Sequence, residues 1–390
     1  MARRSLHVAQ ISFFNDAEGR APAQLLDAWP SLVDVAEAAC RGGVRVSVVQ
    51  ACSHCAHLAR GGVDYYFQPF GETPADSAAG TALRDLLRRL APDVFHVHGL
   101  SFPRHVLSLA ALAPGVPILL QDHANRPPRL WRRALWRRAM PLAAGIAFCA
   151  LEQARAFATT GLLRPHTRLY EIPESTCRFA PGDRQQARRT TSIEGDPAVL
   201  WVGHLDANKD PLTVLEGISA AARALPRLQL YCCYGEAPLL PAVLARIASD
   251  SNLRGRVQLL GRVGRDRIEL LMRAADLFVL GSHREGSGYA LIEALACGLP
   301  PLVTDIPSFR ALTGAGTVGR LWPCDDPQAL CAALHSMAAR AGAEMRSAVR
   351  EHFERELSFD ALGRKLAAMY EDVVEHTRAA EHRPMRAQRE

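Results

Sequence analysis

The sequence predicts an α/β protein made of two doubly wound, Rossmann-like domains that face a cleft. Three observations lead to this prediction. The chain has 390 residues, which is too long for one compact core. Short runs rich in Val, Ile and Leu alternate with helical stretches, as expected for parallel strands that helices cover on both faces. This alternation stops at a polar stretch, residues 179–197, and then starts again, which indicates two separate sheets.

The first predicted domain, residues 1–178, begins with a strand and continues with alternating helices and strands. Its helical patterns cover residues 24–41, 79–90 and 151–159. The predicted strands are residues 6–12, 44–50, 94–98, 117–121, 145–149 and 167–172.

The second predicted domain, residues 198–357, follows the polar stretch at 179–197, which we interpret as a linker. A long helical pattern covers residues 358–377, and we expect the charged tail, residues 378–390, to be disordered. The predicted strands of this domain are residues 198–203, 228–233, 257–260, 277–280 and 301–304.

The composition is that of a folded protein, with 48% hydrophobic and 22% charged residues. No apolar run reaches the roughly 18 residues that span a bilayer. Residues 1–5 lead directly into a predicted strand, so we expect a cytoplasmic location and free thiols for the ten cysteines. Residues 52–57 contain two Cys and two His, but no second ligand pair at zinc spacing accompanies them. We therefore interpret this cluster as a loop.

Positive charge is concentrated in the first half of the chain. Residues 1–195 contain 23 Arg and 16 acidic residues, whereas residues 196–390 contain 23 basic and 24 acidic ones. This imbalance indicates an anionic partner, such as a phosphate, a membrane surface or a charged glycan. The segment from Arg129 to Met140 alternates Arg pairs with Trp, and we interpret it as a core-packed helix with a solvated basic face. Peripheral contact with the inner face of a membrane is the alternative, and nucleic acid is not expected because no reader motif accompanies the charge.

The densest motif lies in residues 277–300, which form a predicted strand, a loop and a helix. Gly286 and Gly288 allow the loop backbone to approach a ligand closely. The helix begins near Gly288, where its free N–H groups suit a diphosphate. Glu285 in the loop and Glu293 in the helix can accept hydrogen bonds from sugar or ribose hydroxyls.

In this segment the chain resembles the family-4 retaining glycosyltransferases. Their motif is a Glu, seven residues and a second Glu, with an Ala-Cys-Gly-Leu-Pro-like ending, and Glu285 and Glu293 match it. The resemblance implies the GT-B fold, with the C-terminal helix crossing back to the first domain. It also implies that the first Glu binds the donor sugar and the second the nucleotide ribose, with Ser287 in the donor-binding loop. The resemblance covers residues 199–322 well and the first domain loosely.

A second match follows the first strand of the second domain. The family has Gly-Arg-Leu there and a Lys a few residues later, and both basic groups neutralise the leaving diphosphate. Here the sequence is Gly203-His204-Leu205, followed by Lys209, which fits. His204 departs from the pattern, because a neutral imidazole stabilises a diphosphate less than a permanent cation does. We expect that His204 works protonated, that Arg284 or another residue compensates, or that turnover is reduced.

Two predicted strands of the first domain end in histidine. The resemblance implies that His123, after residues 117–121, contacts the donor sugar, and His98 is a second candidate. A structural role is the alternative for both. The family's Gly-Gly loop after the first strand is missing, since residues 13–22 contain one glycine. The same loop lacks G-x-G-x-x-G, which argues against a dinucleotide oxidoreductase.

These observations predict a retaining glycosyltransferase that moves a sugar from a nucleoside-diphosphate sugar to a hydroxyl of a glycan or lipid-linked glycan. The predicted catalytic residues are Glu285, His123 and Lys209. No Asp-x-Asp occurs, so we expect neither a metal nor a cofactor. The alternatives are a non-catalytic nucleotide-sugar-binding protein, a sugar-nucleotide epimerase on the same fold and an interaction scaffold.

Overall fold

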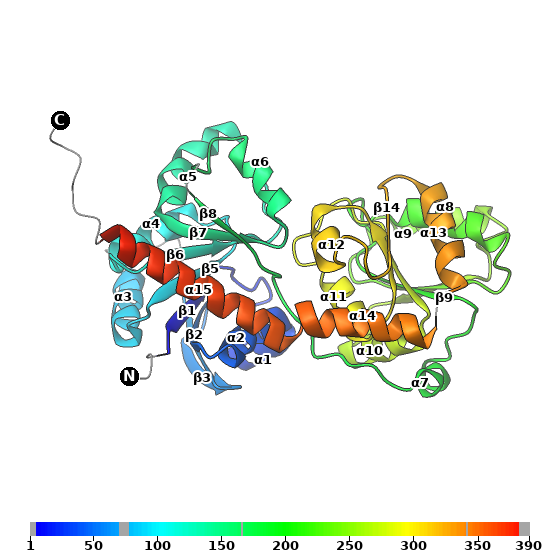
Figure 1. The fold of residues 1–390 in the computed structure, drawn as a ribbon, viewed down its shortest axis with the longest axis horizontal. Coiled ribbons are helices and arrows are strands. Elements are labelled where there is room, and N and C mark those ends of the chain that lie inside the picture. Colours follow the sequence, from blue (N-terminus) through cyan, green and yellow to red (C-terminus); the bar gives the residue numbers. More distant parts are fainter. Residues whose placement is uncertain (1–4, 70–77, 165–166, 341, 382–390) are drawn as a thin grey trace. The chain divides into compact units, whose positions relative to one another are not determined.

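The computed structural model describes residues 5–69, 78–164, 167–340 and 342–381. The chain divides into two compact units (Figure 1). Unit 1 comprises Met1–Thr176 together with Phe359–Glu390, and unit 2 comprises Cys177–Ser358. Each unit is built on its own sheet of mainly parallel strands with helices around it, which confirms the prediction of two Rossmann-like α/β domains.

Unit 1 contains one eight-stranded sheet. Its strands are β1 (His7–Ser12), β2 (Arg45–Ala51), β3 (Ala56–Arg60), β4 (Val63–Gln68), β5 (Val94–His98), β6 (Ile118–Gln121), β7 (Ala143–Phe148) and β8 (Arg168–Glu171). They lie in the order β3-β4-β2-β1-β5-β6-β7-β8, and every neighbouring pair is parallel except β3 with β4. All residues of β1 and β5 are buried, because helices cover both faces of the sheet.

Two hydrophobic cores lie on the two faces of this sheet. Successive strand residues point to opposite faces, so that Val8 packs in one core and Ala9 in the other. The first core contains side chains of α1 (Pro22–Ala28), α2 (Pro30–Arg41) and α15 (Phe359–Glu381). The second contains side chains of α3 (Ala78–Leu90), α4 (Pro103–Leu112), α5 (Arg133–Ala139) and α6 (Ala154–Ala158). Unit 1 also has three short 3-10 turns in its described residues: η1 (Leu130–Arg132), η2 (Met140–Leu142) and η3 (Leu151–Gln153).

Unit 2 contains a six-stranded, all-parallel sheet in the order β11-β10-β9-β12-β13-β14. Its strands are β9 (Ala198–Val202), β10 (Gln229–Cys233), β11 (Val257–Gly261), β12 (Leu277–Leu280), β13 (Pro301–Thr304) and β14 (Arg320–Trp322). Its helices are α7 (Arg184–Thr191), α8 (Pro211–Ala222), α9 (Leu240–Ser249), α10 (Arg265–Ala274), α11 (Tyr289–Ala296), α12 (Pro307–Leu312), α13 (Pro327–Ala338) and α14 (Ala343–Glu356).

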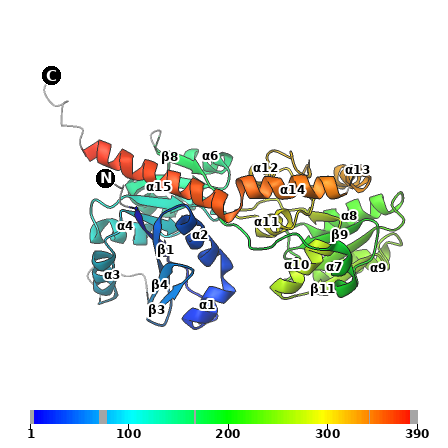
Figure 2. The same cartoon turned by 60° about the horizontal axis from the view of Figure 1, so that its bottom comes forward.

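Helix α15 returns the chain to unit 1, as expected, and packs against α2 (Figures 1 and 2). Its buried residues Leu362, Leu366 and Tyr370 recur every four positions, so they line one face of the helix. That face is fully covered by the first core of unit 1. None of the helices in the described ranges, α15 included, has the length and apolar character that crossing a membrane requires.

Three local predictions in unit 1 are corrected by the structure. The antiparallel pair β3 and β4 was not predicted. Residues 56–57, which were expected to lie in a loop, belong to β3. The His57 ring there pairs with Asp64 at 2.9 Å. The helix expected at residues 24–41 is divided into α1 and α2 because Pro30 cannot continue a helix that precedes it. The helix expected at residues 151–159 is a 3-10 turn followed by the short α6.

The segment interpreted as a linker, residues 179–197, lies entirely within unit 2. It contains α7, which Asp183 caps by accepting a hydrogen bond from the Gln186 N–H at 2.9 Å. Arg184 and Arg188 of α7 both pair with the carboxylate of Asp276, which joins the helix to the start of β12. At the other end of the chain, α15 continues to Glu381, so only residues 382–390 of the expected tail lie outside the described residues.

The close packing of α15 on α2 makes a clear prediction for Gly363. A mid-helix Gly→Ala change usually stabilises by roughly 0.5–1 kcal/mol. A Cβ at Gly363, however, would overlap the carbonyl oxygen of Ala38 in α2. Gly363→Ala should therefore destabilise unit 1 by about 1–3 kcal/mol, seen as a lower midpoint of urea unfolding. The matched change Arg364→Ala, at the next and exposed position of α15, should leave the midpoint nearly unchanged. An unchanged or higher midpoint for Gly363→Ala would contradict the close helix contact.

Candidate functional site

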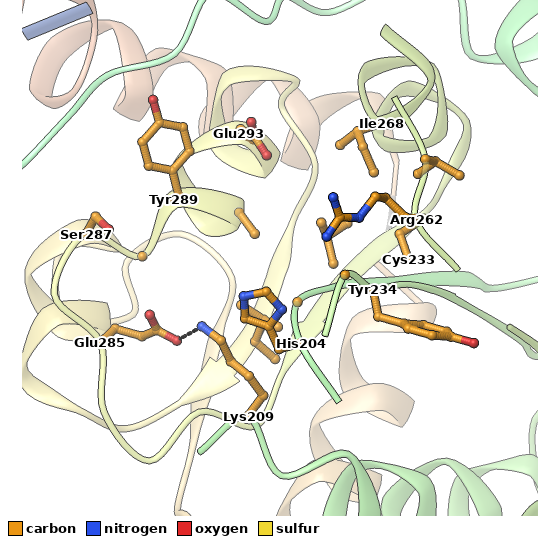
Figure 3. A pocket seen from close by; sticks show the side chains of 17 residues that line it. His204, Lys209, Cys233, Tyr234, Arg262, Ile268, Glu285, Ser287, Tyr289 and Glu293 are labelled. Carbon is orange, nitrogen blue, oxygen red and sulfur yellow. Dashed lines mark hydrogen bonds and ion pairs between the residues drawn. The ribbon is translucent and has the colours of Figure 1, made fainter. Parts of the chain in front are cut away.

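A hollow of about 390 Å³ lies at the carboxyl ends of β9, β10 and β12 in unit 2. This is the edge at which open parallel sheets bind ligands. Figure 3 shows side chains from several loops and from α11 pointing toward it. Predicted site residues among its lining are Gly203, His204, Lys209, Glu285, Ser287, Gly288 and Glu293. Gly286 is buried in the same loop, whereas Arg284 is exposed and does not line the hollow.

The loop that holds Glu285 leads from a buried strand into helix α11. The residue before the helix, Gly288, has φ +55°, a left-handed conformation that favours glycine. A Cβ there would also lie 2.8 Å from a methyl carbon of Leu312. The first backbone N–H groups of α11 follow at this point, and Glu293 lies one turn further, 7% exposed. The loop glycine, the helix start and the carboxylate therefore meet at one side of the hollow.

Lys209 and Glu285 form an ion pair in the hollow (Figure 3). Their side chains are only 18% and 11% exposed. The loop of Lys209 is held by Asp206, whose carboxylate accepts a hydrogen bond from the Lys209 N–H at 2.8 Å. Two of the three predicted catalytic residues are thus in direct contact, although 76 positions separate them in the sequence.

The second carboxylate, Glu293, pairs with a residue that was not predicted. Arg265 approaches Glu293 at 3.2 Å, and its guanidinium lies over the rings of Phe179 at 4.8 Å and Tyr289 at 5.9 Å. Arg265 is the first residue of α10, directly after the loop that follows β11. A basic residue in a loop at the carboxyl end of a predicted strand is a signal that could have identified it.

His204 lies in the hollow as an uncharged ring. Its Nδ1 accepts a hydrogen bond from the backbone N–H of Glu236 at 3.0 Å. A nitrogen that accepts a hydrogen bond has no proton, so the ring holds its single proton on Nε2. In this structure His204 therefore does not provide the positive charge that the family's Arg provides at this position.

A second cluster of predicted residues lies in unit 1. A hollow of about 330 Å³ is lined by His98, His123 and Glu174, together with aromatic and aliphatic side chains of Phe14, Trp29, Leu32 and Val35. The His123 Nδ1–H donates to the Glu174 carboxylate at 2.7 Å, and Nε2 of the same ring lies 3.3 Å from Nδ1 of His98. The structure thus brings the two predicted histidines together and adds Glu174.

The charge state of this cluster follows from its surroundings. Burial lowers the pKa of His123, but the Glu174 carboxylate, its hydrogen bond and Asp122 raise the pKa above the ordinary 6.5 overall. Burial and the neighbouring histidines hold the pKa of His98 well below 6.5. Burial, followed by the Glu174 charge, raises the pKa of Asp122 to about 7. His123 is therefore the ring of this pair that is more readily protonated, and its Nδ1–H donates to Glu174.

Neither Glu174 nor Asp122 was predicted. Asp122 directly precedes His123 at the end of β6, and Glu174 follows β8 in the segment Ile172-Pro173-Glu174. Both are nearly fully buried, at 2% and 4% exposure. A carboxylate within two residues of the end of a predicted strand is the signal that could have identified both.

The loop after β1, which lacks the family's Gly-Gly pair, has its own ordered shape. Gly19 has φ +63°, and Asp16 binds both the Arg20 N–H and its guanidinium at 2.7 Å. The Phe14 ring from this loop packs edge-on toward His123, with ring centres 6.5 Å apart. An aromatic side chain therefore lies beside His123 where the family has glycines.

Part of the basic segment from Arg129 to Met140 packs in the core, as interpreted from the sequence. Trp136 and Met140 are buried in the second core of unit 1, at 7% and 4% exposure. Leu130 and Trp131 of η1 are 74% and 71% exposed. The segment is therefore core-packed at one end and presents apolar side chains to solvent at the other. Trp131 and Arg132 also line a separate hollow of about 700 Å³ in unit 1.

Within the described ranges, one group of side chains has ligand atoms close enough for a metal ion: Asp210, His283 and Asp325, all within 4.8 Å of one another. Asp210 already caps α8, and His283 lies 3.3 Å from it. None of the three lines the hollow of Lys209 and Glu285.

The contact between Glu174 and His123 predicts a change in a measurable pKa. Glu174→Gln removes the negative charge and keeps the shape of the side chain. The pKa of His123 should fall, because burial still lowers it and the Glu174 charge no longer raises it. An NMR titration of the His123 ring proton measures this directly. The exposed Glu152→Gln is the matched control and should leave the titration unchanged. An unaltered pKa in Glu174→Gln would show that the carboxylate does not determine the charge of His123.

Two family models match the chain. The model described as Glycosyl transferases group 1 matches residues 183–353, and the model described as Glycosyltransferase Family 4 matches residues 30–175. The first lies within unit 2 and the second within unit 1.

Relatives of known activity support the same assignment. The chain is 26% identical over 260 residues to the GDP-mannose:cellobiosyl-diphosphopolyprenol alpha-mannosyltransferase of Xanthomonas campestris, a match covering 65% of this chain and 66% of that protein. It is 31% identical over 217 residues to the D-inositol 3-phosphate glycosyltransferase of Geodermatophilus obscurus, a match covering 53% of this chain and 47% of that protein. The chain thus spans less than two thirds of the length of these relatives.

Solved structures share the fold over nearly the whole chain. The Anabaena HepE protein in complex with UDP has a TM-score of 0.69 at 16% identity, covering 94% of this chain and 100% of that one. The sucrose-phosphate synthase of Thermosynechococcus elongatus has a TM-score of 0.67 at 18% identity, covering 95% and 100%. At such identities the likeness concerns the fold alone. The fold and both family models agree, and the chain therefore belongs to the family-4-type glycosyltransferases of the GT-B fold.

Proposed function

We propose that this protein transfers a sugar from a nucleoside-diphosphate sugar to a hydroxyl acceptor, with retention of configuration and without a metal ion. The observation on which this rests is the hollow in unit 2, where Lys209, Glu285, Glu293 and the N-terminus of α11 face one another. A cation and helix N–H groups suit a diphosphate, and buried carboxylates suit sugar hydroxyls.

The ion pairs in the hollow suggest how a donor would bind. Lys209 is paired with Glu285, and a diphosphate would replace the carboxylate as the partner of the ammonium group. Glu285 would then accept hydrogen bonds from hydroxyls of the donor sugar. Glu293, paired with Arg265, is placed one helical turn beyond the loop and would accept from the ribose. The donor would thus exchange protein–protein charge contacts for protein–ligand ones.

The chemical step needs stabilisation of the negative charge on the leaving diphosphate as the glycosidic bond breaks. Lys209 and the first N–H groups of α11 would supply it from fixed positions, which is the form of electrostatic stabilisation that contributes most in enzymes. In the proposed reaction unit 1 supplies His123 as a contact for the donor sugar, held in orientation by Glu174. No side chain is assigned as a covalent nucleophile.

The proposed acceptor is a glycan or a lipid-linked glycan in polysaccharide assembly. The name of the Xanthomonas relative includes a diphosphopolyprenol-linked sugar acceptor, and the name of the Geodermatophilus relative includes a phosphorylated polyol. The excess of Arg in the first half of the chain suits acceptors of this anionic kind. We further propose a cytoplasmic protein that contacts the inner face of a membrane through the exposed Leu130 and Trp131.

The donor site is tested by release of nucleoside diphosphate from a panel of UDP-, GDP- and ADP-sugars in the presence of a chelator. We expect one donor to be turned over, and Glu285→Gln to lower its turnover about 100-fold, because a preorganised polar contact is lost. The exposed Glu216→Gln on α8 is the matched control and should keep full activity. An absolute requirement for a divalent cation would contradict the proposed metal independence.

Product analysis separates the alternatives. NMR of the transferred product should show the anomeric configuration of the donor, and an inverted product would contradict retention. Formation of an epimeric nucleotide sugar without release of nucleoside diphosphate would identify an epimerase. Calorimetric binding of a donor without turnover in the presence of glycan acceptors would favour a non-catalytic binding protein, for which the uncharged His204 is the structural argument. Failure of every donor to bind would refute the proposed donor site.

Membrane contact is tested by cosedimentation with vesicles containing anionic phospholipid. The double change Leu130→Ser and Trp131→Ser should weaken binding about tenfold, equivalent to ~1.4 kcal/mol, because exposed apolar side chains lose their burial in the headgroup region. The control Leu244→Ser removes a solvent-exposed leucine, 50% exposed, from α9 of unit 2 and should have no effect. Absence of wild-type protein from the vesicle pellet would refute the contact.

A further inference from the structure

Lys209 and Arg265, two of the cations around the donor hollow of unit 2, are already paired with its carboxylates. Lys209 pairs with Glu285, and Arg265 pairs with Glu293. These two pairs together have no net charge. His204, at the position where the family has Arg, adds none, because its Nδ1 accepts a hydrogen bond from a backbone N–H. A diphosphate would therefore enter a site with little net positive charge if these groups were its whole electrostatic environment.

Arg262 adds a further positive charge to the hollow. It directly follows β11, at the carboxyl edge of the sheet, and lines the same hollow. Figure 3 shows its guanidinium in the hollow beside the His204 ring. Among the residues that the structure describes, no carboxylate pairs with Arg262, in contrast to Lys209 and Arg265. Its charge is thus available to a ligand.

The space between Arg262 and His204 is kept open by a glycine. A Cβ built on Gly235 would lie 3.7 Å from Nη2 of Arg262 and 3.4 Å from Cε1 of His204. The guanidinium and the imidazole therefore approach the same point from the loops that follow β11 and β9. An anionic group at this point would contact a permanent cation on one side and a neutral ring on the other.

We propose that Arg262 binds the diphosphate of the donor and supplies the positive charge that His204 lacks. The inference rests on the proposed function, since it requires a nucleoside-diphosphate sugar in this hollow. A guanidinium offers planar, charged N–H donors that match phosphate oxygens. The substitution of Arg by His at position 204 is then compensated from the neighbouring loop after β11, and Arg284, which is exposed outside the hollow, is not needed for it.

The competing role for Arg262 is contact with the nucleobase, for which its planar group is also suited. The two roles predict different affinities for the nucleoside and for the nucleoside diphosphate. A contact with the diphosphate strengthens binding of a nucleoside diphosphate and hardly affects the nucleoside, whereas a contact with the base affects both equally. Comparison of these two ligands on one variant therefore separates the roles.

The test measures calorimetric affinity for the nucleoside diphosphate and for the nucleoside of the preferred base, on four proteins. We expect Arg262→Gln to weaken binding of the diphosphate tenfold or more and to change nucleoside binding less than twofold. Arg254→Gln, an exposed arginine outside the hollow, is the matched control and should bind both ligands like the wild type. Adding His204→Arg to Arg262→Gln should recover most of the lost affinity, because it restores a permanent cation at the family's own position.

Each remaining result has a definite meaning. Unchanged diphosphate affinity in Arg262→Gln would overturn the inference and leave the proposed function intact. Equal losses for nucleoside and diphosphate would also overturn it, in favour of a base contact. A double variant that binds no better than Arg262→Gln would show that the two positions do not share a role. A wild-type protein that binds no nucleoside diphosphate would refute the proposed function and, with it, this inference.

Discussion

The donor hollow depends on one geometric constraint, namely that neighbouring parallel strands end at the same edge of a sheet. Strands β9 and β12 are paired directly, so the loops that follow them emerge side by side. The approach is close: a Cβ at Gly281 would lie 3.1 Å from the carbonyl oxygen of Lys209. The His283 N–H also donates to the Asn208 carbonyl at 2.8 Å, which joins the two loops by their backbones. Lys209 therefore meets Glu285 because of the sheet topology, before any ligand is considered.

The pairing of charges in the hollow has a consequence for selectivity under the proposed function. A partly buried ammonium or carboxylate is costly without a partner, and removing one member of such a pair leaves the other uncompensated. A free sugar could replace Lys209 as the partner of Glu285 but would leave Lys209 without an anion. A bare diphosphate could replace Glu285 as the partner of Lys209 but would offer no hydroxyl donors to that carboxylate. Only a molecule with both a diphosphate and sugar hydroxyls satisfies both groups, which favours intact nucleotide sugars over their fragments.

The sequence predicted elements whose signal is local and missed those that depend on distant partners. Residues 277–280 and 301–304 were predicted with the bounds of β12 and β13, because buried parallel strands are continuous apolar runs. Helix α7 has almost no apolar residues, and its ion pairs with Asp276 lie about 90 positions away in sequence. The hollow of unit 2 was predictable from the spacing of two carboxylates in one motif. Glu174 was not, because its contact with His123 joins the ends of two strands 51 positions apart.

The return of the chain to unit 1 connects the C-terminal helix to the histidines of that unit. His96 and His98 are two positions apart in β5, so both point to the face that α15 covers. The Tyr370 hydroxyl of α15 lies 2.7 Å from Nδ1 of His96, and the rings of His96 and His98 lie 4.5 Å apart. Burial lowers the pKa of His96 to about 3, so this ring stays neutral and adds no charge behind His98. Of the three rings, only His123, which lies beside the carboxylate, has a pKa that is raised above the ordinary value. Through Tyr370, helix α15 thus helps to bury the histidine that lies behind His98 and His123.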